Sequence, residues 1–480
     1  MFELPPKRKR GRSPGAEVRP RGAHKRGKRI VSLLATLQRG DEPEGDPQAA
    51  SLLGVPGLTR QALDACVAAF FGSTRHTVRV SQPADLFARR VRVMLYETAG
   101  LEVPKDLMGI EAAGEFLALA ISALGAPASP YPQLEGALRE RCLELATDAE
   151  YLANAGLDAV EAANLIAEGP YPIGISHLCE SNPLVLDPLG LGYPVELAVY
   201  HNVHIQPVGG DHVRREAVFW SVWAGDALRS TCVGIQAAMA DTDVGWPWNP
   251  ADDPAMPLAR VARHISSSLL SARARCTGLH SEDLRMAVNE LDVLAKGTNF
   301  DLARLRAADN PEMMTLPATM AMLAARNLLY VVCWAAAKCD AIQHPRNLAS
   351  RMVDEVEAAA MRGAQYMVSL AHTIVESKLP VPVVVSSRLV SVVVFLVHRV
   401  LENTQKGRPE RNLEPVGNAD ALINAIEGME CYADTASVAV ALRDALARAE
   451  GPDAQPALVP DLVTMLLQHN IQTPFSALEI

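Results

Sequence analysis

Apolar residues recur at spacings of three and four along most of the chain after residue 58, which is the spacing of one face of an α-helix. Residues 317–338 are apolar on nearly every side, so we predict a helix at the centre of a core there. The longest regular stripe is formed by Met352, Val356, Ala360, Gly363, Met367, Leu370 and Ile374. Its small members would let a second helix approach closely. The pattern predicts a mainly α-helical body.

Two further helices are predicted in the first half. Residues 86–100 (LFARRVRVMLYETAG) have helical spacing and end in a glycine, which commonly stops a helix. Apolar residues between positions 134 and 152 also recur every three or four residues, and Gly156 follows as a stop.

The centre of the chain has a different composition. Residues 195–206 (VELAVYHNVHIQ) and 213–224 (VRREAVFWSVWA) are rich in Val, Ile, Tyr and Trp, and PVGGDH lies between them. This arrangement predicts a β-hairpin, with residues 231–236 as a third strand. We therefore expect a small antiparallel β insertion in a helical protein.

The fold class predicted is mainly α: a multi-helix globular body with a small central antiparallel β insertion and a disordered basic N-terminal arm. Residues 1–57 form the arm and an acidic, Pro-rich linker. Residues 58–245 form a helical domain that holds the β-hairpin. Residues 241–257 contain two tryptophans and four prolines and predict a rigid boundary loop, so residues 246–480 form an all-helical C-terminal domain.

Charge divides the chain more sharply than hydrophobicity does. Residues 1–30 hold 11 basic and 2 acidic side chains, a net charge of 11 − 2 = +9. The whole chain has 45 basic and 55 acidic side chains, so the other 450 residues hold 34 and 53, a net charge of 34 − 53 = −19. A compact basic end on an acidic body is expected when that end meets a polyanion and the rest does not.

The arm carries two basic clusters about 15 residues apart. Lys and Arg at this density neutralise phosphates with little sequence preference, which predicts binding to a nucleic-acid backbone. The same clusters are typical of a two-part nuclear localisation signal, and a tail that only aids solubility is the third interpretation. The basic residues are Lys7, Arg8, Lys9, Arg10, Arg12, Arg19, Arg21, Lys25, Arg26, Lys28 and Arg29.

Two arginine pairs in the body could extend such a contact. Arg89 and Arg92 are three residues apart and would share a helix face, and Arg260 and Arg263 would do the same. These pairs could line a groove for a nucleic-acid backbone. Exposed faces paired with nearby carboxylates are the alternative interpretation.

No catalytic, cofactor or metal motif is found in the sequence. His201, His204 and His212 resemble a ligand set, but residues 201 and 204 of a strand would point to opposite faces. Ser176 lacks the glycine that follows a nucleophile in an elbow, and the glycines at 190 and 192 lack a third. We therefore predict neither an enzyme nor a cofactor or metal site.

The eight cysteines are scattered without a CxxC pair, which indicates reduced thiols of an intracellular protein. The basic N-terminus is not followed by an apolar segment, so a secretory signal is not expected. Apolar runs are shorter than the roughly 20 residues of a membrane span, and no membrane partner is predicted.

The layout predicts a non-enzymatic assembly protein of the viral capsid or nucleocapsid type. Its helical body would associate with copies of itself, and its arm would bind nucleic acid, with RNA favoured over DNA. The location would be the virion or the cytoplasm or nucleus of a host cell. The main alternative is a nuclear adaptor or regulatory scaffold whose arm only binds an import receptor, and an enzyme with an unrecognised site is the third.

Overall fold

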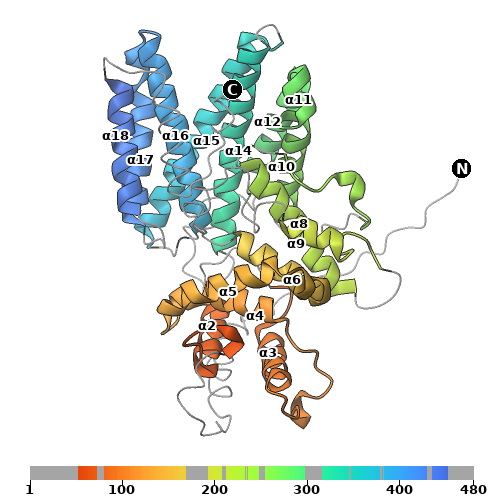
Figure 1. Ribbon diagram of the computed structural model, residues 1–480. Helices are drawn as coiled ribbons and strands as arrows, with labels where there is room; N and C mark the ends of the chain where they lie inside the picture. The colour runs from red at the N-terminus through yellow and green to blue at the C-terminus, as the bar shows by residue number, and fades with distance from the viewer. Residues whose placement is uncertain are drawn as a thin grey trace, which may run out of the picture. The chain divides into compact units, whose positions relative to one another are not determined.

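A computed structural model describes the chain over residues 52–72, 80–168, 193–207, 212–232, 234, 236–247, 255–297, 316–344, 347–378, 381, 383–429 and 435–451 (Figure 1). All of these residues belong to one unit, Gly45–Ile480. The predicted basic arm lies outside the described residues.

The described residues form α-helices joined by short turns, and no strand occurs among them. The predicted mainly α class is confirmed. The α-helices are α2 (Arg60–Gly72), α3 (Ala84–Thr98), α4 (Glu115–Gly125), α5 (Glu135–Thr147), α6 (Ala149–Glu168), α8 (Tyr193–Tyr200), α9 (His212–Cys232), α10 (Ala255–Leu269), α11 (Ala272–Thr277), α12 (Ser281–Ala295), α14 (Leu316–Gln343), α15 (Ser350–Glu376), α16 (Val383–Gln405), α17 (Leu413–Gly428) and α18 (Thr435–Glu450). Short 3-10 helices are η1 (Leu52–Gly54), η2 (Lys105–Leu107), η3 (Ala126–Ala128), η4 (Pro132–Leu134), η5 (Asp241–Asp243) and η8 (Pro409–Arg411).

The predicted β insertion is wrong over its described residues, because α8 and α9 occupy the two expected strands. Residues of high strand propensity in α9 recur at helical spacing, and Phe219, Val222 and Trp223 are buried together on one side. Burial of that face therefore outweighs the intrinsic strand propensity of these residues. The only β-type pairing in the described part of the chain is an isolated bridge between Ile205 and Gly245.

The helix predicted across residues 134–152 is two helices, α5 and α6. Asp148 separates them, and its Oδ1 accepts the backbone N–H groups of Glu150 and Tyr151, each at 3.0 Å. This is the usual N-cap arrangement of an aspartate. Gly156 has a non-helical backbone (φ +60°, ψ −142°) and interrupts α6 with a kink, as its prediction as a helix stop leads one to expect, and the chain continues as helix beyond it.

The predicted central helix and the long apolar stripe are both confirmed. Helix α14 is buried along almost its whole described length, and it packs against α15, α16, α12, α10 and α9 (Figure 1). All seven residues of the α15 stripe are buried. The two helices come close at Gly363, because a Cβ there would lie 3.0 Å from the carbonyl oxygen of Asn327 and 3.3 Å from the ring of Tyr330.

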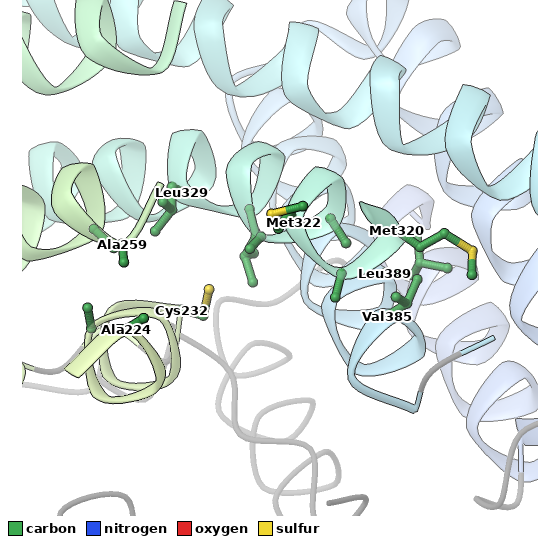
Figure 2. Close-up of a cluster of buried hydrophobic side chains, with 14 of the residues drawn as sticks. Ala224, Cys232, Ala259, Met320, Met322, Leu329, Val385 and Leu389 are labelled. Carbon is green, nitrogen blue, oxygen red and sulfur yellow. The ribbon is translucent and has the colours of Figure 1, made fainter. Parts of the chain in front are cut away.

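Helices from both sides of the predicted boundary at residue 246 share one apolar cluster (Figure 2). Its labelled members are Ala224 and Cys232 of α9, Ala259 of α10, Met320, Met322 and Leu329 of α14, and Val385 and Leu389 of α16. Each large side chain buried in such a cluster stabilises the fold by roughly 1.5–3 kcal/mol. A division into two domains at this point stays a prediction.

Two segments, Ala318–Ala341 and Val384–Gln405, are long and apolar enough to cross a membrane. The most apolar 18-residue window of the first segment is 94% buried inside the protein, and that of the second is 76% buried. A core helix of a soluble protein passes the same test of length and hydropathy. Length and composition alone therefore give weak evidence for a span.

Candidate nucleic-acid interface

The eleven basic residues of the arm, positions 7–29, lie outside the described residues, as do Ser176 and the glycines at 190 and 192. The structure therefore places only four of the predicted contact residues: Arg89, Arg92, Arg260 and Arg263.

Arg89 and Arg92 lie on α3 but differ in exposure. Arg89 is exposed, and its Nη2 donates a hydrogen bond of 3.0 Å to the carbonyl oxygen of Asp106. Arg92 is half-buried, and its positive charge acts on Asp64 of α2. Only Arg89 is freely presented to a ligand in solution.

Arg260 and Arg263 lie on α10, and their side chains differ even more in exposure. Arg260 is exposed, whereas Arg263 is only 5% exposed. The guanidinium of Arg263 pairs with Asp226 and Asp241 at 3.4 and 2.5 Å, and it lies 4.8 Å from the ring of Trp223. This charge is already neutralised inside the protein, so we leave Arg263 out of the proposed interface.

The two arginine pairs also lie on helices that pack against different neighbours. Helix α3 packs against α2, whereas α10 packs against α9, α12 and α14. The packing therefore gives no reason to combine the two pairs into a single groove.

A buried ionic cluster, which we call the α3–α6–α9 joint, was missed in the sequence. Asp158 of α6 accepts hydrogen bonds from Arg90 of α3, at 3.2 and 2.9 Å, and pairs with Arg214 of α9. Arg214 also contacts Glu161 at 2.8 Å, and the backbone N–H of Gly114 donates to Asp158 at 2.6 Å. Burial raises the pKa of Asp158, but Arg214 and Arg90 outweigh that effect and hold it below its ordinary value.

A second ionic cluster, the α14–α15–α16 cluster, surrounds Glu402. Lys338 of α14 donates to Glu402 at 2.9 Å, Lys406 donates at 2.5 Å, and Arg399 bridges Glu402 to Glu357 of α15. Burial opposes ionisation, but these partners lower the pKa of Glu402 to about 2. Both clusters hold helices together and use up cationic side chains.

The turn between α16 and α17 is a basic surface that the sequence analysis did not single out. Arg408 and Arg411 are exposed within four residues, with Glu410 between them as the acidic member, whereas the neighbouring Lys406 is already paired with Glu402. Asn403 fixes the turn, since its carbonyl accepts the N–H of Arg408 at 2.8 Å and its Nδ2 lies 3.4 Å from the carbonyl of Arg411. Such a turn could make one or two phosphate contacts.

The chain finds no match among protein-family models, curated proteins or solved structures.

The histidines of the central region do not form a ligand set. His201 and His204 follow α8, His204 Nδ1 lies 3.4 Å from the carbonyl oxygen of Ala198, and His212 begins α9. Among the residues that the structure describes, no group of three or more His, Cys, Asp or Glu side chains could hold a metal ion. The six cysteines in these residues are free thiols. What the described part of the chain offers to a partner is charged side chains and apolar surfaces.

Proposed function

We propose that this protein is a non-enzymatic assembly protein of the capsid or nucleocapsid type. Copies associate through the helical body, and the basic arm neutralises the backbone of packaged nucleic acid, with RNA favoured over DNA. The observation that carries the proposal is the division of charge, +9 in residues 1–30 against −19 in the rest of the chain.

The described contacts support this division of labour. Many cationic side chains of the body are engaged with carboxylates of the same chain, and this holds for Arg60, Arg90, Arg139, Arg141, Arg214, Arg263, Arg285, Lys338, Arg351, Arg399 and Arg443. A paired cation gains little from a phosphate, because it must first give up its carboxylate. The arm is therefore the main source of positive charge for a polyanion in this proposal, with the exposed side chains of Arg89, Arg260, Arg408 and Arg411 as weaker contacts.

Deleting residues 1–29 tests the proposal. We expect the helical circular dichroism and the melting temperature to stay unchanged, while retention of single-stranded RNA loses its salt dependence. Each phosphate contact on a single strand contributes a slope of about −0.7 in a plot of log K against log salt concentration. If about six arm residues make contacts, the full chain has a slope of about −4 and the truncated chain one near zero.

A matched pair of variants separates the arm from the body. Replacing Lys7, Arg8, Lys9 and Arg10 by Gln should weaken retention, whereas replacing Arg89 and Arg260 by Gln should change it less. Unchanged retention after deletion of the arm would contradict the proposal and move binding to the body.

The second candidate is a nuclear adaptor whose arm is only an import signal, and the spacing of the two basic clusters favours it. Sedimentation of the full chain separates the candidates. An assembly protein should form large homo-oligomers near micromolar concentration, whereas an adaptor should remain a monomer or a dimer.

A further inference from the structure

The C-terminal end of α8 carries a small apolar surface that the described chain leaves open. Val199, Tyr200 and Ile205 are 45%, 61% and 47% exposed, although they lie within seven residues of one another. Glu196, one helical turn before Tyr200, is exposed beside them, and the guanidinium of Arg215 reaches the same end of the helix. We call these five residues the α8 face.

The backbone explains why this surface points outward. Asn202 has a φ of +54°, its N–H donates to the carbonyl of Val199 at 3.0 Å, and the N–H of Val203 donates to the carbonyl of Ala198 at 2.7 Å. This pair of hydrogen bonds is a Schellman motif, in which the residue at the left-handed position ends the helix. Val203 and Ala198 are buried by the turn, so Tyr200 and Ile205 are left on the outer side.

Two side chains of the α8 face are already held in place. The ring of Tyr200 lies edge-on to His201, with ring centroids 5.0 Å apart. Arg215 Nη1 donates to the carbonyl oxygen of Asn202 at 3.1 Å and lies 3.4 Å from that of His201. Side chains that are ordered before binding lose less entropy on association, and Tyr and Arg are the residues enriched at the energetic centres of interfaces.

The charges of the α8 face point to its partner. Glu196 and Arg215 have opposite signs, and neither has an ion-pair partner among the described residues. A body with a net charge of −19 repels its own copies over most of its surface, so a contact between copies needs a surface that is apolar and balanced in charge. In a two-fold contact, residue i of one copy meets residue j of the other and the reverse. Glu196 and Arg215 provide such a reciprocal pair.

We propose that the α8 face is a self-complementary contact between two copies of this chain. Tyr200 and Ile205 pack across the contact, and Glu196 of each copy pairs with Arg215 of the other. This inference rests on the proposed assembly function, for which it names one surface. A face of this size suits a weak contact repeated in a large assembly, because stable isolated complexes bury at least about 1,000 Å².

Charge reversal tests the reciprocal pair. Glu196→Arg and Arg215→Glu should each weaken self-association of the full-length protein at least 10-fold, measured by sedimentation velocity over a concentration series without nucleic acid. A mixture of the two single variants should associate again, because one copy then carries two positive and the other two negative groups. The double variant Glu196→Arg/Arg215→Glu should also recover association with itself.

Controls separate the contact from folding. Tyr200→Asp should weaken association to a similar degree, whereas Val293→Asp on α12, where the side chain is 67% exposed, should leave it unchanged. Melting temperatures should be equal for all variants. A lower melting temperature of the variants, with no recovery of self-association in the mixture, would indicate that another segment of the same chain covers the α8 face. This result would overturn the inference.

Further outcomes overturn it in distinguishable ways. If the wild-type protein and all α8-face variants assemble equally well, this contact is overturned and the proposed function still stands. Wild-type protein that remains a monomer at high concentration would overturn the proposed function itself. Variants that alter RNA retention but not sedimentation would show that nucleic acid occupies the face.

Discussion

Two buried carboxylates, Asp158 of α6 and Asp64 of α2, have pKa values shifted in opposite directions, although burial alone raises the pKa of both. Asp158, in the α3–α6–α9 joint, keeps a pKa below its ordinary value, whereas burial raises the pKa of Asp64 on α2 to about 6. Both are near two arginines: Arg90 and Arg214 act on Asp158, and Arg60 and Arg92 act on Asp64.

The difference lies in how closely the arginines approach rather than in their number, because Arg214 and Arg90 come within hydrogen-bond distance of Asp158 and their charges act on it most strongly. Asp158 receives guanidinium N–H groups at 2.9 and 3.2 Å and a backbone N–H at 2.6 Å. The closest approach of Arg60 to Asp64 is 3.9 Å, which is outside hydrogen-bond distance. A buried charge is therefore stabilised by donors aimed at its oxygens, and positive charge at longer range does not replace them.

The largest expected effect is the loss of the Asp158 charge. Asp158→Asn leaves Arg90 and Arg214 buried with only partial compensation, and such a change costs about 3–5 kcal/mol. Chemical denaturation at pH 7 measures it. Because the folded pKa is depressed, the wild-type advantage is present above the unfolded pKa and shrinks as pH falls below about 4. The control is Asp85→Asn at the exposed start of α3, which should cost less than about 1 kcal/mol.

Glu402 extends the comparison to a carboxylate with three cationic partners. Its pKa falls to about 2 from an ordinary 4.5, which at about 1.4 kcal/mol per pKa unit corresponds to about 3.5 kcal/mol. Solvent screens this partly exposed cluster, so Glu402→Gln should cost about 2–3 kcal/mol at pH 7. The folded pKa is again the lower one, so this difference should disappear between pH 4.5 and pH 2. Glu427→Gln removes a solvent-exposed pair with Arg443 and should change stability little. Equal effects of the two substitutions would contradict this account.

Gly114→Ala tests whether the donor geometry at Asp158 matters. An added Cβ would lie 2.9 Å from the Cβ of Asp158 and 3.3 Å from its Oδ2, so the carboxylate must move away from the N–H that it accepts. We expect a loss of about 1–2 kcal/mol in denaturant unfolding. Gly136→Ala on α5 has open space around its Cβ and should not destabilise.

Asp64→Asn should change the free energy of unfolding in the opposite direction and stabilise the protein. A carboxyl whose folded pKa is raised destabilises the protein when it is ionised, and that penalty is absent below the unfolded pKa and develops as pH rises through about 6. The variant should therefore be more stable than wild type by about 1 kcal/mol at pH 8 and equal to it below pH 4. Melting curves at the two pH values check this. A destabilised variant at pH 8 would show that Arg60 and Arg92 hold Asp64 more tightly than the distances indicate.

Features set by local spacing could be predicted from the sequence. The stripe on α15 and the apolar α14 were predicted because a buried helix face repeats within a few residues, and Gly363 was identified as a close approach for the same reason. The strands expected at α8 and α9 were wrong because Val, Ile and Trp favour strands only where their packing does.

Features set by long-range contacts could not be predicted. Asp158 lies 68 residues from Arg90 and 56 from Arg214, and nothing in the sequence pairs them. The same limit applied to Arg263, which has the spacing of an exposed partner of Arg260 but turns inward to Asp226. The basic arm was recognised by charge alone, which predicts a polyanion but no binding geometry.

The burial of α14 on every side has a consequence for the making of the protein. Its partners α9, α10 and α12 precede it in the chain, but α15 and α16 follow it, so the ribosome delivers this apolar helix before two of the helices that cover it. At about 5–20 residues per second, the roughly 60 residues to the end of α16 take several seconds. During that interval the nascent chain exposes its most aggregation-prone segment, so a chaperone that shields it would raise the yield of folded subunits, and chains terminated before α16 would be cleared or precipitate.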